Sequence, residues 1–304
     1  MLDTARRSIF EEEHEAFRAA ARRFVEREFS PRLMEFEAAG IVDRSFWKAA
    51  GGAGLLCPGV PEAYGGLGLD FRYNAIINEE MTYACASDCI ALQSDVTTPY
   101  MVRYGSEAQK EYWLPRMVSG ETVTAIAMTE PGAGSDLQGV RTSAVRDGDD
   151  YVINGSKTYI TNGQNADLIF LVVKTEPNAG AKGTSIVLVE GDRRGFKRGR
   201  NLEKVGQWSS DTSELFFEDV RVPADNLLGR ENQGFIYLVS ELAQERLSIS
   251  VTAQAAAQRA YDEAVNFVKS RKAFGKFIFE FQNTRFTLAD MAARLQVGWA
   301  HLDW

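Results

Sequence analysis

The distribution of apolar residues divides the chain into a helical region, a strand-rich region and a second helical region. In residues 9 to 29 apolar side chains recur at the spacing of an amphipathic helix, and Pro31 ends this run. The same spacing predicts a long helix over residues 71 to 92, after which the small and polar segment 93 to 99 interrupts the pattern. A cap residue, Ser106, predicts the start of a helix that continues to Met117. Shorter predicted features are a helix over residues 44 to 53 and a glycine-rich loop over residues 61 to 70.

From residue 121 the period of the pattern changes to that of β-strands. Turn signals such as Asp147-Gly148 and Asn154-Gly155 separate short apolar or alternating runs. The predicted strands cover residues 122–128, 139–146, 150–154, 157–161, 167–174, 184–190, 195–199 and 212–218. Together they predict a compact all-β module of roughly a hundred residues, which is a usual domain size.

The third region returns to helical spacing. Residues 234 to 268 are alanine-rich and helical, a basic turn follows at 271 to 276, and another helix begins near Phe281 and still runs at Trp304. No stop signal is present there, so we expect the natural chain to continue. The predicted fold class is α+β and multidomain. It comprises an N-terminal helical domain (1–120), a central all-β domain (121–229) and a C-terminal helical bundle (230–304), the last of them incomplete in this sequence.

Composition excludes several classes of function. A net charge of −8 argues against nucleic acid as the main partner, because phosphate binding favours a positive surface. No apolar run approaches the length of a membrane span, and the N-terminal residues turn acidic where a secretory signal would be apolar. Few cysteines and no signal indicate a reducing compartment such as the cytoplasm. Cys85 and Cys89 lie one helical turn apart and could share a metal, but no histidine lies near them in sequence; buried free thiols and no metal are favoured.

The scarcity of histidine restricts the candidates for a general base. The chain has only two histidines, so proton abstraction must fall to a carboxylate or, less readily, to another side chain. Helical spacing places Glu245 on an apolar stripe, which we expect to be buried: Leu238, Leu242, Glu245, Ile249 and Ala256. Apolar surroundings raise the pKa of a carboxyl group, which suits a base near neutral pH. A buried salt bridge with Arg246 or another arginine explains the same position, and the pattern leaves both open.

Two predicted strands end in segments that could contact a ligand, TEPGAGSD (129–136) and YITNG (159–163). Glycines let a flat or phosphorylated ligand approach the backbone, and Thr129 and Ser135 offer hydroxyl groups. A dinucleotide-binding fold is excluded because the loop leads into further strands and Gly139 falls at the wrong spacing. An ordinary hairpin turn explains the loop alone equally well. Arg271 and Lys276 could likewise bind phosphate or form a solvated turn.

Several blocks along essentially the whole chain, in order and at matching spacing, resemble the acyl-CoA dehydrogenase family of flavoproteins. They are AMTEPGAGSD (127–136), NGSKTYITNG (154–163), SDTSELFFEDVRVP (210–223), ERL (245–247) and RKAFGK (271–276) with Gln282. The strings TEPGAGSDLQG and ELAQERL are most similar to the long-chain branch. The resemblance implies the three-domain order predicted above, with FAD between the β domain and the C-terminal bundle.

The resemblance also implies roles for single residues. Residues 126 to 135 would line the flavin, Thr129 would bond the polar edge of the ring, Tyr159 would pack against the isoalloxazine, and Thr161 would bond near N5. The implied FAD-binding set is Ile126, Ala127, Met128, Thr129, Gly134, Ser135, Tyr159, Ile160, Thr161, Arg271, Phe274 and Gln282. Arg271 and Gln282 match residues that reach the FAD of a neighbouring subunit, which implies a homotetramer. The implied acyl-CoA contacts are Ser135, Ala181, Lys182, Ala243, Gln244, Glu245 and Arg246.

Glu245 occupies the position at which the long-chain and isovaleryl branches carry their base, whereas most members carry it on a later loop. The implied function is FAD-dependent α,β-dehydrogenation of an acyl-CoA to the trans-2-enoyl-CoA in fatty-acid β-oxidation. Glu245 would take the α-proton, flavin N5 the β-hydride, and electron-transfer flavoprotein the electrons. The alternatives are a flavin oxidase or monooxygenase of the same fold, and a non-catalytic scaffold that binds flavin or CoA. Tyr159, where many members have Trp, and Gln207-Trp208 depart from the family pattern.

Overall fold

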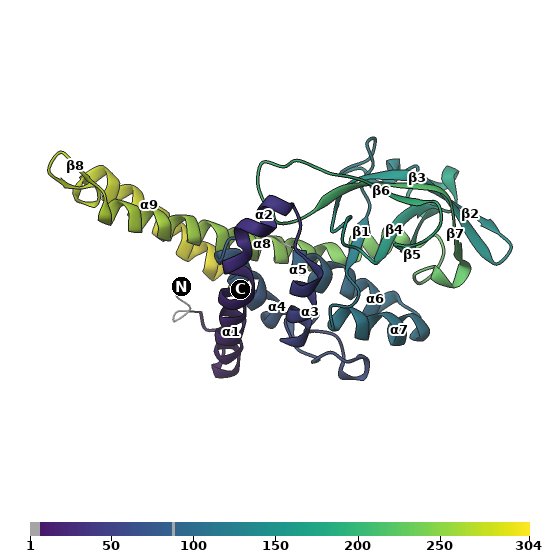
Figure 1. Ribbon diagram of the computed structural model, residues 1–304, viewed down its shortest axis with the longest axis horizontal. Helices are drawn as coiled ribbons and strands as arrows, with labels where there is room; N and C mark the ends of the chain where they lie inside the picture. Colours follow the sequence, from purple (N-terminus) through teal and green to yellow (C-terminus); the bar gives the residue numbers. More distant parts are fainter. Residues whose placement is uncertain (1–6, 87–88) are drawn as a thin grey trace.

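The computed structural model describes residues 7–86 and 89–304, and it is arranged as a group of helices, a β module and a long helical hairpin (Figure 1). In this described part, helices occupy the chain up to Val118, strands lie between Thr124 and Pro223, and helices return from Gly234. The α+β fold class with its helix, sheet, helix order is therefore confirmed. No helix within the described ranges is both long and apolar enough to span a membrane.

The N-terminal helices pack around an apolar core rich in phenylalanine. They are α1 (Glu12–Phe24), α2 (Leu33–Ala39), α3 (Arg44–Gly52), α4 (Phe71–Tyr83), α5 (Cys89–Ala91), α6 (Thr98–Tyr104) and α7 (Glu107–Val118). Phe29 and Phe46 are fully buried and their ring centroids lie 5.5 Å apart. The predicted cap of α7 is confirmed, because Ser106 Oγ accepts from the Gln109 N–H at 3.2 Å and Gln109 Oε1 accepts from the Ser106 N–H at 3.0 Å.

Two predicted breaks in this helical region are wrong. Pro31 does not end the first run; α1 passes through a π-helical turn (Val25–Phe29) and a 3-10 turn (Ser30–Arg32) into α2. Pro31 lies in the first turn of that 3-10 segment, where its missing N–H removes no intrahelical bond. The segment 93 to 99 is not an interruption either. It belongs to the π-helix η4 (Leu92–Thr97) and the start of α6, and its small polar side chains are buried and hydrogen-bonded. Conversely, the helix predicted over 71 to 92 stops at Tyr83.

The β module is built on one seven-stranded sheet in the order β1-β4-β2-β3-β7-β6, with β5 paired to β4. Its strands are β1 (Thr124–Ala127), β2 (Ser143–Asp147), β3 (Asp150–Thr161), β4 (Leu168–Lys174), β5 (Thr184–Glu190), β6 (Phe196–Asn201) and β7 (Thr212–Pro223). Side chains of β4 alternate between two cores: Phe170 packs with the helices, whereas Ile169 and Leu171 pack within the module. This alternation joins the β module to the N-terminal helices.

β3 is a single strand, although the sequence pattern predicted two strands separated by a turn at Asn154-Gly155. It pairs with β7 on both sides of Gly155, with register shifts at Ile153/Gly155 and Lys157/Ile160. A Cβ at Gly155 would lie 2.7 Å from the Cα of Thr142, and its φ of 151° lies in a region that side chains avoid. Gly155 therefore permits a close approach at a β-bulge and does not form a hairpin turn.

The C-terminal region is a long antiparallel helical hairpin that projects away from the β module (Figure 1). α8 (Gly234–Ser270) and α9 (Gln282–Asp303) are connected by the two-stranded ribbon β8 (Lys272–Ala273) and β9 (Lys276–Phe277) and a 3-10 turn (Ile278–Glu280). The predicted basic turn is the tip of this ribbon, where Phe274 and Gly275 both have positive φ angles of 54° and 80°.

Candidate active site

The segment that follows β1 lies beside the last part of β3, so the two segments that the sequence singled out as possible ligand contacts are neighbours. The Thr158 N–H donates to the Thr129 carbonyl oxygen at 3.0 Å. The Lys157 ammonium donates to the Met128 carbonyl oxygen, also at 3.0 Å. We call residues 128–130 and 157–161 together the strand-end wall. Backbone and side-chain hydrogen bonds fix the two halves of this wall to each other.

A buried ion pair supports the strand-end wall from behind. Lys157 Nζ lies 2.9 Å from Glu130 Oε1, and the two residues are 1% and 7% exposed. The Glu130 carboxylate also accepts from the backbone N–H groups of Arg141 and Thr142 at 2.7 and 2.9 Å. Burial opposes ionisation of Glu130, but Lys157 and these hydrogen bonds outweigh it and hold its pKa below the usual value. Burial lowers the pKa of Lys157 to about 8, against the opposing effect of Glu130.

Sequence reasoning did not single out Glu130 or Lys157, although both lie in the quoted blocks. The only local signal was a lysine at the start of the predicted strand 157–161, where an apolar residue would be usual in a buried strand. Such a residue is buried only when it has a partner, and the partner lies on a segment that only the fold brings close.

Tyr159 is the exposed aromatic residue of the strand-end wall. The residue is 69% exposed and has a φ of 58°, a left-handed conformation that is strained for a side chain other than glycine. It lies within the register shift between Lys157 and Ile160 on β3. In the neighbouring loop, a Cβ added at Gly132 or Gly134 would meet no atom within 4 Å. The strand ends therefore carry an exposed aromatic ring and a glycine loop with open space around it.

The other residues assigned to flavin binding differ in what they expose. Ile126, Ala127 and Ile160 are buried, with exposed fractions of 8%, 0% and 2%. Their side chains pack into the cores, so any ligand contact falls to the backbone. Met128, Thr129 and Thr161 are partly buried, whereas Gly134 and Ser135 are exposed. Thr129, Ser135 and Thr161 therefore offer hydroxyl groups, and Gly134 offers an exposed backbone.

The helical side of the site is formed by α8, and the predicted apolar stripe is not its buried face. Leu238 is buried, but Ile249 is 66% exposed and Ala256 is also exposed. The buried face of α8 consists of Gly234, Leu238, Glu241, Ser248, Val251, Thr252 and Ala255. It therefore includes polar residues, because α4, η4 and α6 provide partners for them. Glu241, which lies outside the predicted stripe, is one of the most buried residues of the helix at 2% exposure.

Two glutamates one turn apart on α8 have opposite surroundings. Glu241 accepts hydrogen bonds from Arg103 and Tyr104, both at 2.8 Å, and is fully committed to them. Glu245 is partly buried and accepts one hydrogen bond, from the Tyr100 hydroxyl to Oε1 at 3.0 Å. Burial raises the pKa of Glu245, Glu241 adds to this effect, and Tyr100 and Arg246 oppose it. Among the described residues Glu245 has no salt bridge within 4 Å. The buried salt bridge that the sequence left open for Glu245 is instead made by Glu241, with Arg103.

A hollow of about 650 Å³ begins one turn after Glu245 on α8. Its walls come from α8, from α2, from the end of α4 with the residues that follow it, and from the loop that precedes β7. The residues are Glu37, Thr82, Cys85, Ala86, Gln207, Ser209, Ile249, Thr252, Ala253, Ala256, Arg259, Ala260 and Glu263. Many of the side chains from α8 are small or apolar, which gives the hollow a wall suited to an apolar ligand. Gln207, which departs from the family pattern, is one of its lining residues.

The structure brings together only some of the residues implied as acyl-CoA contacts. Ala243 and Arg246 flank Glu245 and are exposed, while the Gln244 amide donates inward to the Asp95 carbonyl oxygen at 3.0 Å. Ala181 and Lys182 lie in the turn Pro177–Gly183 before β5, and Lys182 is exposed.

Arg271, Phe274 and Gln282 lie far from the strand-end wall, at the ribbon tip of the α8–α9 hairpin (Figure 1). All three are on the surface, and Phe274 is 96% exposed. Within one chain they do not meet the other residues assigned to flavin binding.

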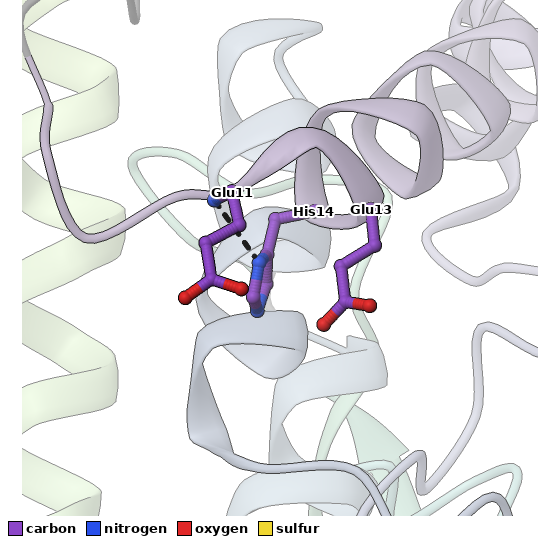
Figure 2. A group of neighbouring side chains, drawn as sticks. All are labelled: Glu11, Glu13 and His14. Carbon is purple, nitrogen blue, oxygen red and sulfur yellow. Dashed lines mark hydrogen bonds between the residues drawn. The ribbon is translucent and has the colours of Figure 1, made fainter.

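The group Glu11, Glu13 and His14 is the one cluster in the described residues with ligand atoms close enough for a metal ion. Figure 2 shows the imidazole between the two carboxylates at the start of α1. His14 Nδ1 accepts from the Glu11 N–H at 3.2 Å, so the neutral ring carries its proton on Nε2. The cluster therefore caps α1 through Nδ1, while His14 Nε2 is buried without a hydrogen-bond partner among the described residues. Of the cysteines, Cys57 is buried, Cys85 is exposed contrary to expectation, and the side chain of Cys89 lies outside the described residues.

Comparison with known proteins agrees with this architecture region by region. Residues 11–121, 125–220 and 232–302 match the N-terminal, middle and C-terminal domain models of acyl-CoA dehydrogenase. The chain is 46% identical to the long-chain specific acyl-CoA dehydrogenase of Sus scrofa mitochondria, over all of this chain and 71% of the relative.

Solved structures give the same result. An acyl-CoA dehydrogenase from Geobacillus kaustophilus is 51% identical with a TM-score of 0.95, covering 97% of this chain and 78% of that one. A glutaryl-CoA dehydrogenase from Mycobacterium smegmatis, in complex with FADH2, is 29% identical with a TM-score of 0.90, covering 97% of this chain and 75% of that one. The chain therefore belongs to the acyl-CoA dehydrogenase family of FAD-dependent oxidoreductases.

Proposed function

We propose that Glu245 is the base that removes the α-proton when this chain dehydrogenates an acyl-CoA thioester to the trans-2-enoyl-CoA. The observation that carries this proposal is the contrast between the two glutamates of α8. Glu241 is saturated by Arg103 and Tyr104, whereas Glu245 is partly buried, has a raised pKa and accepts only from a neutral hydroxyl. A carboxylate in this state can accept a proton near neutral pH without first breaking an ion pair.

The strand-end wall and the adjoining loop 131–136 carry features that support FAD binding. Gly132 and Gly134 leave open space where a side chain would stand, so a ligand can approach the backbone. Tyr159 offers an exposed aromatic face, and Thr129 and Thr161 offer hydroxyl groups beside it. We propose that these residues hold the isoalloxazine, and that Ser135 and the backbone of 126 to 129 complete this contact. When bound, FAD supplies the acceptor for the hydride that leaves the β-carbon.

The chain itself contributes position and proton transfer. Glu245 accepts the α-proton on its carboxylate and becomes neutral, which its partly buried site favours. A site closed to water would strengthen the hydrogen bonds made to the thioester carbonyl as negative charge develops there. General-base catalysis of this kind typically contributes about 10²–10⁴-fold to the rate.

The substrate that we propose is a long-chain acyl-CoA. The support is the identity to long-chain relatives and the apolar hollow that begins at Ile249, one turn beyond the base. Ala181, Lys182, Ala243 and Arg246 would then contact the CoA portion. We further propose that the chain forms a homotetramer in which Arg271, Phe274 and Gln282 complete the FAD site of another subunit. Electrons would pass to an electron-transferring flavoprotein; a chain of this fold occurs in a structure of that protein from Acidaminococcus fermentans, with a TM-score of 0.90.

The decisive experiment is anaerobic titration of the FAD-loaded protein with acyl-CoAs of graded length and branching, monitored by flavin absorbance. The native protein should bleach most readily with long chains. Glu245→Gln should keep FAD bound but bleach about 10²–10⁴-fold more slowly, because the amide cannot accept the proton. The matched control is Glu218→Gln, which alters an exposed glutamate on β7 and should bleach like the native protein.

Each contrary result identifies a different error. Undiminished bleaching of Glu245→Gln contradicts the assignment of the base. Bleaching by none of the acyl-CoAs contradicts the dehydrogenase function itself. Oxygen consumption with peroxide formation in air, at a rate matching bleaching, would favour the alternative of an oxidase of the same fold.

A further inference from the structure

The segment formed by η4 and α6 lies along α8 and contacts it through polar side chains at successive turns. Asp95 reaches Ser248 and Gln244, Tyr100 reaches Glu245, and Arg103 with Tyr104 reaches Glu241. Polar contacts between helices are costly unless every group is paired, so a repeated series indicates a defined alignment of the two elements. We call Asp95, Tyr100, Arg103 and Tyr104 the α8-facing row.

Asp95 anchors this row at one end. Its carboxylate is 1% exposed and accepts from Asn74 and Asn78 of α4, both at 2.6 Å, and from the Ser248 hydroxyl. Its backbone carbonyl accepts from Gln244 at 3.0 Å. Gln244 and Ser248 stand on either side of Glu245, so Asp95 fixes the backbone around the proposed base. The π-helical turn of η4 brings the carboxylate and the carbonyl of one residue to the same helix.

Tyr100 is the member of the row that contacts Glu245 directly. It is fully buried, and its hydroxyl donates to Glu245 Oε1 at 3.0 Å. Burial, and after it the charge of Glu245, raises the pKa of Tyr100, so the phenol stays protonated and remains a donor. Among the described residues, Oε2 of Glu245 receives no hydrogen bond, so one carboxylate oxygen is held and the other is left to accept a proton.

We propose that Tyr100 is the positioning residue of the base: its hydroxyl holds Oε1 of Glu245, directs Oε2 to the substrate and keeps the resting carboxylate ionised. This inference rests on the proposed role of Glu245. It assigns to α6 a part in proton abstraction that is separate from flavin binding and from CoA recognition. Asp95 supports the same geometry through Gln244 and Ser248, without contact with the carboxylate of Glu245.

The charged groups around Glu245 set the sign of the expected effect. On α8, Glu241 raises the pKa of Glu245 and Arg246 lowers it, while burial raises it most. On α6, Arg103 and Tyr104 face Glu241, and Tyr100 alone faces Glu245. A donor to the ionised carboxylate lowers its pKa, so removal of the Tyr100 hydroxyl raises it. Because the base must be ionised to accept a proton, the acid limb of kcat/KM moves to higher pH.

The test is the pH profile of kcat/KM for the FAD-loaded native protein and Tyr100→Phe, with a long-chain acyl-CoA and an artificial electron acceptor. The acid limb of Tyr100→Phe should move up by about one pH unit, with about tenfold lower kcat/KM below the limb and recovery at alkaline pH. The matched control is Tyr104→Phe, which removes the same atom from the next turn of α6 but from Glu241. The acid limb of its kcat/KM profile should lie at the same pH as that of the native protein.

A substitution of opposite sign tests the proposal even if Tyr100→Phe folds poorly. Site-specific 3-fluorotyrosine at position 100 keeps the shape and is a stronger donor, so it should move the acid limb to lower pH. Two results overturn the positioning role and leave Tyr100 a packing residue. One is a uniform loss of activity at every pH in Tyr100→Phe. The other is an acid limb at the same pH in Tyr100→Phe and Tyr104→Phe. If Glu245→Gln retains activity in the same assay, the proposed base itself is wrong; a failure of Tyr100 alone leaves that assignment intact.

Discussion

The strand-end wall and the α8 side of the site are held in place by different means. The strand ends are joined by a backbone hydrogen bond from Thr158 to Thr129 and supported by the buried Lys157–Glu130 pair. The α8 side is held by side-chain hydrogen bonds from the α8-facing row, and its central glutamate keeps one oxygen free. A surface that receives a flat cofactor needs a fixed shape, whereas a base needs a defined direction and an unpaired acceptor. The difference suggests which interactions should govern stability and which should govern protonation.

The largest expected effect on stability comes from breaking the support of the strand-end wall. Lys157→Met should lower the free energy of unfolding by about 3–5 kcal/mol, because it leaves Glu130 buried without its cation. Chemical denaturation of the FAD-free protein measures this loss. The control Lys197→Met breaks an exposed pair with Glu218 and should cost no more than about 0.5 kcal/mol. Equal costs for the two variants would show that the buried pair does not support the wall.

A smaller loss is expected from the anchor of the other side. Asp95→Asn keeps the shape of the side chain but turns one acceptor into a donor that faces other donors, Asn78 or Asn74. The free energy of unfolding should fall by about 1–3 kcal/mol, as for a buried hydrogen bond to a charged group. Asp290→Asn, which alters an exposed i,i+4 pair on α9, is the control and should change little in the same denaturation experiment. A result as small as the control's would mean that the anchor contributes no stability.

The smallest expected effect concerns the strained aromatic residue of the strand-end wall. Tyr159→Gly relieves a left-handed conformation worth about 1–2 kcal/mol and adds a glycine cost of about 0.5–1 kcal/mol, so unfolding stability should stay equal or rise slightly. FAD affinity should fall roughly 2–10-fold, because ring stacking contributes about 0.5–1.5 kcal/mol. Tyr159→Phe keeps the ring and should keep the affinity. Unchanged FAD binding by the glycine variant, measured by flavin fluorescence, would remove Tyr159 from the cofactor site.

The sequence predicted elements well where a local pattern carried the information. The cap at Ser106, most strands of the module and the helix, sheet, helix order all follow from residues close together in the chain. The predictions from sequence were wrong where a residue is compatible with two different local structures. Pro31 and Asn154-Gly155 were interpreted as breaks, yet Pro31 fits the start of a 3-10 turn and Gly155 permits a bulge in a continuous strand. The segment 93 to 99 was interpreted as an interruption because its residues are polar, although they are buried with partners on α4 and α8.

By itself the sequence determined the family, and it pointed to the two strand ends proposed to face the cofactor and to the glutamate proposed as base. Each of these depends on residue identity at fixed spacing, which a linear chain retains. Only the tertiary structure decided that Glu241 is the glutamate in an ion pair, that Lys157 meets Glu130, and that the Tyr100 hydroxyl reaches Glu245. The reason is physical: whether a buried polar group is stable depends on the partner that meets it, and these partners come from elements far apart in the sequence.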